Sequence, residues 1–181
     1  MTAFLNDYES FDNRLIKASK DTQPWVEHPM YNKFEYDSDF LNYHNKTKTV
    51  AFLIIKNDSL LYEKYYDGYD RNTKSNSFSM SKSIVSALMG MAIQEGYIKN
   101  IDQLVVDFLP QLKGPYANLL TVGDLSSMAS GLKWDESYYS PFSITTRSYV
   151  EEDLNELILN QPINKKPGES YSYLSGATQL L

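Results

Sequence analysis

Residues 76–83, with the sequence NSFSMSKS, stand directly before an apolar run with helical spacing, residues 84–95. Positions i and i+3 share one face of a helix, with Cβ atoms about 5–6 Å apart, so the side chains of Ser79 and Lys82 are expected to meet. A desolvated lysine can take the proton of a neighbouring serine and make it a nucleophile. The N–H groups and partial positive charge of a helix start suit a developing oxyanion. This stretch therefore predicts a Ser–Lys hydrolase site.

Composition sets limits on the other classes of function. A chain of 181 residues, 42% hydrophobic and 14% aromatic, fits one ordinary domain with a real core. A net charge of −6 without any basic cluster argues against a nucleic-acid or anionic-membrane partner. The absence of cysteine from the sequence excludes disulfides, zinc–thiolate sites and thiol catalysis.

The sequence also bears on localisation. Its N-terminus lacks the basic and apolar regions of a signal peptide, and no run approaches the roughly 18 apolar residues of a membrane-spanning helix. A cytoplasmic protein is the default expectation, and a periplasmic or anchored form stays open if the N-terminus is incomplete. The oligomeric state cannot be read from the sequence.

Upstream of the Ser–Lys pair, residues 2–20 are predicted to form an amphipathic helix, because apolar residues recur there at i+3 and i+4 spacing. The residues concerned are Phe4, Leu5, Tyr8, Phe11 and Leu15. Residues 21–39, which are aromatic-rich and contain two prolines, are interpreted as an irregular lead-in.

A β-hairpin is expected next. Residues 49–55 and 59–66 are β-rich runs, and Asn57 and Asp58 between them supply turn chemistry. The first run is nearly all apolar, so we expect its strand to be buried on both faces.

Downstream, the patterning is mainly helical. After the helix that ends near Gly96, helices are predicted at residues 102–109, from Thr121 to a stop at Ser130 and Gly131, and at residues 149–159. The simplest interpretation is one compact domain, with residues 1–78 holding the first helix and the hairpin and residues 79–181 forming a mainly helical region.

Other candidate sites are weaker. A second Ser-x-x-Lys match, Ser130 to Lys133, contains the helix-breaking Gly131 and no predicted helix follows it. Both histidines, His28 and His44, precede the hairpin in an irregular region, so a Ser-His-Asp triad is not expected.

Asp135 and Glu136 are the remaining acidic candidates. Two adjacent carboxylates in a loop more often serve as caps or face solvent than act as an acid pair. The sequence has no metal-binding or phosphate-binding motif, so no metal or organic cofactor is implied.

Four segments together resemble a known family. They are FSMSKS at residues 78–83, LTVGDL at 120–125, MASGLKWDE at 128–136 and PGESYSYLSG at 167–176. In combination they resemble the serine β-lactamase-related hydrolases, and within them the class C-like branch, which includes esterases and 6-aminohexanoate-dimer hydrolases. The similarity runs from residue 49 to residue 181. It implies an α+β, β-lactamase/transpeptidase-like fold, with an antiparallel sheet flanked by helices and a mainly helical subdomain.

The resemblance also assigns roles to residues. Ser79 would be the acylated nucleophile and Lys82 its general base, acting on a small-molecule ester, amide or lactam. The family's Tyr-x-Asn motif corresponds to Tyr173 and Ser175, because the strict matches at Tyr43 and Tyr116 lack the preceding Pro-Gly turn. Tyr173 would relay a proton between Ser79, Lys82 and the leaving group. Ser175, in place of asparagine, would be the substrate-binding residue, and this replacement weakens the expectation of amide recognition.

One family motif, Lys/His-Ser/Thr-Gly, does not occur in the sequence. We therefore expect the chain to be the N-terminal part of a longer hydrolase, truncated before the C-terminal strands, and to be inactive and poorly stable alone. The alternative is a non-catalytic, penicillin-binding-like sensor of the same fold, in which Ser79 is acylated without efficient release.

Overall fold

The computed structural model describes residues 4–10 and 12–181, and it divides into two compact units, Met1–Ser77 and Phe78–Leu181. The grouping of the two parts in a single domain stays a prediction.

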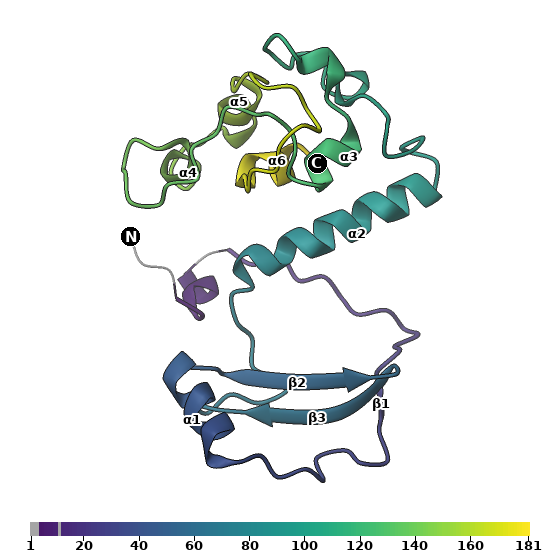
Figure 1. Ribbon diagram of the computed structural model, residues 1–181, viewed down its shortest axis with the longest axis vertical. Helices are drawn as coiled ribbons and strands as arrows, with labels where there is room; N and C mark the ends of the chain where they lie inside the picture. The colour runs from purple at the N-terminus through teal and green to yellow at the C-terminus, as the bar shows by residue number, and fades with distance from the viewer. Residues whose placement is uncertain (1–3, 11) are drawn as a thin grey trace. The chain divides into compact units, whose positions relative to one another are not determined.

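The first unit is built around a β-hairpin (Figure 1). In chain order its elements are η1 (Asp7–Ser10), β1 (Val26–Glu27), α1 (Ser38–Thr47), β2 (Ala51–Lys56) and β3 (Ser59–Tyr65). Strands β2 and β3 pair antiparallel, with Lys56 opposite Ser59. Asn57 and Asp58 form the two-residue turn with φ angles of 49° and 57°, the left-handed conformation that asparagine and aspartate tolerate best. The predicted hairpin is confirmed.

The sheet differs from the prediction in two respects. Its strand order is β1-β3-β2, and β1 runs parallel to β3, so the lead-in expected to be irregular contributes a short strand. The prediction that residues 49–55 are buried on both faces is wrong, because Leu53 and Ile55 of β2 are exposed. β2 lies at the edge of this sheet, and the central strand β3 supplies the buried side chains Leu60 and Tyr62 instead.

Aromatic side chains join α1 to the hairpin. The helix begins after Asp37, whose carboxylate accepts a hydrogen bond from the Phe40 backbone N–H at 2.9 Å. Phe40 and the buried His44 lie one helical turn apart, and both rings contact Phe52 of β2. His44 is therefore a core residue of the first unit.

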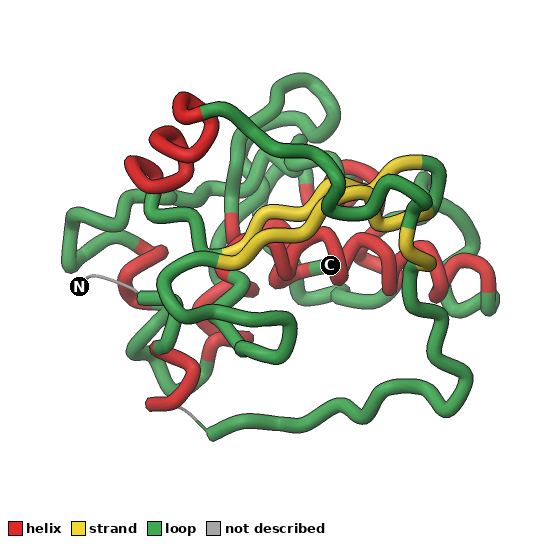
Figure 2. Tube along the Cα trace, turned by 90° about the horizontal axis from the view of Figure 1, so that it is seen from below, coloured by secondary structure: helices red, strands yellow, loops and turns green. Residues whose placement is uncertain are grey.

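The predicted helix over residues 2–20 is wrong for the described part of that range. Only η1 (Asp7–Ser10) is helical there, and the stretch that follows residue 11 is drawn as a long loop in Figure 2. Leu15 and Ile16 are 76% and 87% exposed. Without a surface to bury its apolar face, a short amphipathic sequence gains too little to stay helical. Thr2 and Phe11, which belong to this prediction, lie outside the described residues.

The second unit holds the longest helix and a set of short ones (Figure 1). Its elements are η2 (Phe78–Met80), α2 (Ser81–Gln94), η3 (Val105–Asp107), η4 (Ala117–Leu119), α3 (Val122–Ser126), α4 (Ile144–Arg147), α5 (Leu154–Leu159) and α6 (Ser175–Leu180). Gly96, with φ of 82°, follows the end of α2 as predicted. Thr121 caps α3 in a capping box with Asp124, which confirms the predicted start.

Three predicted helices are shorter than expected. The helix that begins after Thr121 ends at Ser126 and not at Ser130. Residues 102–109 form only the 3₁₀ turn η3, and residues 149–159 become helical only from Leu154. The carboxylate of Asp153 accepts a hydrogen bond from the Glu156 N–H and sets that start.

The core of the second unit gathers around α3 and α6. Its buried members are Val105, Leu112, Ala117, Leu120, Val122, Leu125, Leu132, Ile163, Leu174 and Ala177. α6 packs against α3 and α5 (Figure 1). Leu174 and Ala177 insert into this core at the start of α6, so the backbone next to Tyr173 is fixed by hydrophobic burial. Among the described residues, no helix has both the length and the apolar character to cross a membrane.

Candidate active site

Ser79 and Lys82 meet at the start of α2. Ser79 lies in the 3₁₀ turn η2, which leads directly into α2, and Lys82 lies in the first turn of that helix. The Nζ atom of Lys82 donates a hydrogen bond of 3.0 Å to Oγ of Ser79. The distance lies within normal hydrogen-bonding range, so a proton can pass directly between the two atoms.

The residue before the candidate nucleophile has an unusual backbone. Phe78 has φ of 46°, in the left-handed region that bulky side chains rarely occupy. Such a conformation costs on the order of 1–3 kcal/mol and persists only where the surrounding structure imposes it. The hydroxyl of Ser81 donates to the Phe78 carbonyl at 2.9 Å and helps to hold this turn.

Tyr173 comes to the same place from a distant part of the chain. Lys82 Nζ lies 5.2 Å from the centroid of the Tyr173 ring, within the range of a cation–π contact. Tyr173 is 39% exposed, whereas Leu174 beside it is buried in the core. The structure thus brings together three of the four residues singled out from the sequence.

Ser175 makes a different contact. Its backbone N–H donates to Oε2 of Glu136 at 2.7 Å, and its hydroxyl donates to Oε1 of the same carboxylate at 2.5 Å. The phenol of Tyr138 also donates to Glu136 Oε1, at 2.7 Å. Sequence reasoning expected Glu136 to be a cap or solvated, and it gave no sign of a partner 39 positions away. The only signal for this residue was its place in the MASGLKWDE segment.

The Glu136 carboxylate stays ionised in this setting. Burial opposes its negative charge, but the backbone and hydroxyl hydrogen bonds from Ser175 and the bond from Tyr138 outweigh burial and hold the pKa of Glu136 below its usual value. Burial, and then the bond to Glu136, raise the pKa of Tyr138 to about 12. The hydrogen bonds to Glu136 are therefore charge-assisted.

This contact limits what Ser175 can offer a substrate. A serine hydroxyl has one proton and two lone pairs, and in this arrangement the proton points to Glu136. Toward a ligand the oxygen retains only acceptor capacity. The prediction that Ser175 binds substrate stays a prediction, but an asparagine amide at this position would donate as well as accept.

The second Ser-x-x-Lys match lies in a structural turn. Ser130 is fully buried, and its Oγ accepts from the Leu132 backbone N–H at 3.3 Å. Gly131 has φ of 67°, and a Cβ there would stand 2.1 Å from the carbonyl oxygen of Lys165. The turn therefore requires glycine, and no helix follows it to align Lys133 with Ser130.

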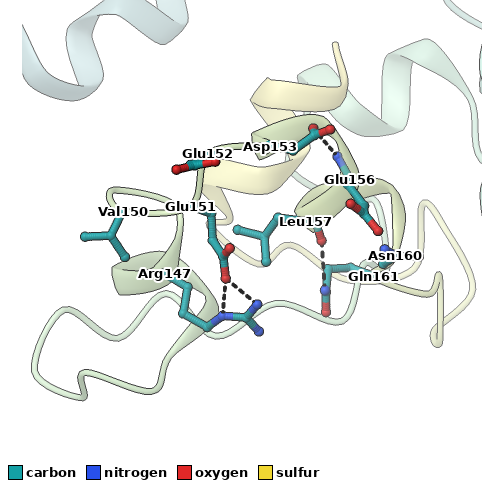
Figure 3. A pocket seen from close by; sticks show the side chains of 9 residues that line it. All are labelled: Arg147, Val150, Glu151, Glu152, Asp153, Glu156, Leu157, Asn160 and Gln161. Atoms are coloured by element: carbon teal, nitrogen blue, oxygen red, sulfur yellow. Dashed lines mark hydrogen bonds and ion pairs between the residues drawn. The ribbon is translucent and has the colours of Figure 1, made fainter.

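A separate pocket of about 560 Å³ lies around α4 and α5 (Figure 3). Its lining is strongly acidic, and Arg147 pairs with Glu151 at its edge at 2.5 Å. None of the four candidate site residues lines this pocket. Within residues 4–10 and 12–181, no group of three or more histidine, aspartate or glutamate side chains is arranged to hold a metal ion.

The sequence is similar to one protein-family model and to several curated proteins. The Beta-lactamase family model matches residues 22–181. A 6-aminohexanoate-dimer hydrolase of Paenarthrobacter ureafaciens is 30% identical over 98 residues, which cover 54% of this chain and 25% of that protein. Protein flp of Staphylococcus aureus is 28% identical over 142 residues, which cover 72% of this chain and 28% of that protein. The chain spans about a quarter of the length of the curated relatives it matches.

Solved structures share the fold. A Bacillus anthracis protein, provisionally named a 6-aminohexanoate-dimer hydrolase, superposes with a TM-score of 0.62 at 18% identity, over 77% of this chain and 40% of that one. A Bacteroides dorei DSM 17855 protein, provisionally named a β-lactamase, gives a TM-score of 0.60 at 23% identity, over 79% and 42% of the two chains. The predicted β-lactamase/transpeptidase-like α+β fold is confirmed.

Proposed function

The chain belongs to the Beta-lactamase family, and on that premise we propose that it supplies the nucleophile, the base and the proton relay of a serine hydrolase that works through an acyl-enzyme. The observation that carries the proposal is the 3.0 Å hydrogen bond between Lys82 Nζ and Ser79 Oγ at the start of α2. The lysine amine is the base within reach of the serine proton.

Acylation begins with Lys82 in its neutral form. The amine takes the proton of Ser79 as Oγ attacks the carbonyl carbon of the substrate, and an oxyanion forms on the carbonyl oxygen. The N-terminal N–H groups of α2 have no carbonyl partner within the helix, and they favour this negative charge.

Collapse of the tetrahedral intermediate breaks the bond to the leaving group. That group needs a proton, and the hydroxyl of Tyr173, whose ring lies beside Lys82, gives its own proton to the leaving group and takes the proton that Lys82 received from Ser79. Water then attacks the carbonyl carbon of the acyl-enzyme and gives a proton to Lys82, which returns that proton to Oγ of Ser79 as the acyl–Oγ bond breaks and the acid product leaves. The cycle consumes one water molecule and needs no cofactor.

The substrate class we propose is a small-molecule ester, amide or lactam, because all three present a carbonyl carbon to Ser79. The Paenarthrobacter relative is named for hydrolysis of the 6-aminohexanoate dimer. For this chain, an amide substrate of related size is one member of the proposed class.

The test uses the natural protein that contains these residues. It is mixed with p-nitrophenyl acetate and, separately, with a chromogenic cephalosporin, and release of the chromophore is followed on the millisecond-to-second scale. Mass spectrometry of the quenched reaction, followed by peptide mapping, locates the adduct. We expect a burst equivalent to one active site and an acyl adduct on Ser79.

Two variants make the test specific. Ser79→Ala should abolish both the burst and the adduct, whereas Ser83→Ala, an exposed serine one turn further along α2, should retain both. An adduct on another residue, or a full burst in Ser79→Ala, contradicts the proposal. A stoichiometric adduct on Ser79 that persists for hours without turnover would rule out the hydrolase and favour the alternative function, a non-catalytic sensor.

A further inference from the structure

The segment that carries Tyr173 is fixed on both sides of this residue. On one side the Ser172 backbone N–H donates to the Met128 carbonyl at 2.8 Å. On the other side Leu174 is 5% exposed in the core, and Ser175 gives two hydrogen bonds to Glu136. The Tyr173 backbone is thus held on both sides. Ser172 and Ser175 are bonded to residues of the segment 128–136, and Leu174 is buried in the core.

Glu136 supplies a cap that the local sequence lacks. The residue before α6 is Leu174, whose side chain cannot accept a hydrogen bond from the N–H groups of the first turn. A carboxylate from 39 positions upstream accepts the Ser175 N–H in its place. The first backbone N–H of α6, two residues after Tyr173, is therefore satisfied by a side chain that lies outside the helix.

Glu136 is itself held firmly. Trp134, two residues earlier, packs against Gly176 and donates its indole N–H to Thr145 Oγ1 at 2.9 Å. The hydroxyl of Thr145, which is 2% exposed, donates in turn to the Asp135 carbonyl at 2.6 Å. Trp134 and Asp135, the two residues that precede Glu136, are thus tied to the buried Thr145, so the Glu136 carboxylate is a rigid anchor and not a mobile surface acid.

We infer that Glu136 is a positioning residue, whose carboxylate fixes Ser175 at the start of α6 and thereby holds Tyr173 against Lys82 for proton transfer. Ser175 is then an anchoring residue for Tyr173, in addition to any contact it makes with substrate. This inference rests on the proposed function, because it takes Tyr173 as the proton relay. An error on the order of 1 Å in the position of a relay group lowers a reaction rate by about 100-fold.

The test is a double-mutant cycle on the acylation rate constant in the natural protein. Glu136→Gln keeps the volume of the side chain but replaces one acceptor oxygen with an NH₂ donor, so it cannot accept both bonds from Ser175. Tyr173→Phe removes the relay and is expected to slow acylation by about 10²- to 10⁴-fold. Glu136→Gln alone should slow it by about 10- to 100-fold with KM little changed.

The double variant is decisive. If Glu136 acts through Tyr173, adding Glu136→Gln to Tyr173→Phe causes no further loss, because the group it positions is already absent. If the two losses multiply, Glu136 has only a general structural role and the inference is wrong. Glu169→Gln is the matched control. Glu169 lies on the segment that carries Tyr173, but its side chain is exposed and pairs with Lys166. It should leave the rate unchanged.

Tyr173→Phe and Glu136→Gln distinguish a failure of the proposed relay from a failure of the positioning role of Glu136. A normal acylation rate in Tyr173→Phe overturns the relay and the inference with it. A slow Tyr173→Phe beside a normal Glu136→Gln overturns the inference alone. If Glu136→Gln does not fold, Glu136→Asp takes its place, because it keeps the negative charge and draws the carboxylate back from Ser175 by the length of one methylene group. It should slow acylation several-fold when Tyr173 is present and not at all in the Tyr173→Phe background.

Discussion

Gly176 lies directly against the indole ring of Trp134, so that a Cβ at position 176 would stand 2.5 Å from Cε3 of the ring. Neither side can yield easily, because the indole N–H is bonded to Thr145 and Gly176 is in the first turn of α6. We expect Gly176→Ala to lower the free energy of unfolding by about 1–3 kcal/mol, as overpacking of a core does. Urea unfolding followed by circular dichroism measures the change.

Gly90→Ala is the matched control for that substitution. Gly90 lies within α2, and a Cβ there meets nothing within 4 Å. Alanine at this position should be neutral or should stabilise by up to about 1 kcal/mol, since glycine is a poor helix former. Trp134→Leu should reduce the cost of Gly176→Ala, because it removes the atoms that collide. Equal effects of Gly176→Ala and Gly90→Ala would show that the close packing against Trp134 does not exist.

Lys82→Arg distinguishes two roles that Lys82 can have beside Ser79, that of a general base and that of a fixed positive charge. Arginine keeps the positive charge but does not lose its proton at any ordinary pH, so it cannot act as the base. We expect acylation of Lys82→Arg to fall by about 10²- to 10⁴-fold, the usual contribution of general base catalysis. The burst phase with p-nitrophenyl acetate measures this loss.

Lys82→Met is the companion variant, because it keeps most of the side-chain volume and removes the charge. If Lys82 is the base, both variants are slow to a similar degree. A fast Lys82→Arg beside a slow Lys82→Met would mean that Lys82 acts only through its charge, and the base would have to be sought elsewhere.

Local spacing explains what the sequence predicted well. The meeting of Ser79 and Lys82 follows from i, i+3 geometry, and the hairpin follows from Asn57 and Asp58, whose side chains favour a tight turn. Both features depend on residues within a few positions of one another.

Long-range packing explains what was missed. The bond between Glu136 and Ser175 joins positions 39 residues apart, and no periodic pattern reports such a pair. The absence of a helix over residues 12–20 has the same origin, because an apolar stripe becomes a stable helix only where another surface covers it. Leu15 has the spacing of a core residue and yet is 76% exposed.

Tyr65 and Tyr66 are adjacent and half-buried, but their hydroxyl groups differ. The Tyr65 hydroxyl donates to Glu63, whereas the Tyr66 hydroxyl is covered and has no hydrogen-bond partner among the residues that the structure describes. A buried polar group without a partner costs about 1–3 kcal/mol. Tyr66→Phe should therefore leave the free energy of unfolding unchanged or raise it by about 1 kcal/mol or more.

Tyr65→Phe is the same chemical change at the next position. It removes a hydrogen bond to a carboxylate and should lower the free energy of unfolding by about 1–2 kcal/mol. Paired urea titrations of the two variants give the comparison directly. Destabilisation of equal size in both would mean that the Tyr66 hydroxyl has a partner after all.

Glu63 is a buried carboxylate that ties three segments of the first unit together. It accepts hydrogen bonds from the Arg71 guanidinium and from the hydroxyls of Tyr31 and Tyr65. The Arg71 bonds have the largest effect, and despite the opposing effect of burial they lower the pKa of Glu63 from its ordinary 4.5 to about 2. The carboxylate is thus charged in the folded unit at a pH where the unfolded chain would already bind a proton.

This shift makes stability depend on pH in a defined window. Because the folded pKa is the lower one, the contribution of Glu63 is fully present above pH 4.5 and is lost as the pH falls toward 2. Glu63→Gln should lower the free energy of unfolding at pH 7 and flatten its decline between pH 4.5 and 2, since the variant has no proton to gain there. Glu35→Gln, at an exposed position of the same unit, should keep the wild-type slope. Urea titrations at pH 7, 4.5 and 3 test both variants, and a wild-type slope in Glu63→Gln would show that other carboxylates cause the acid sensitivity.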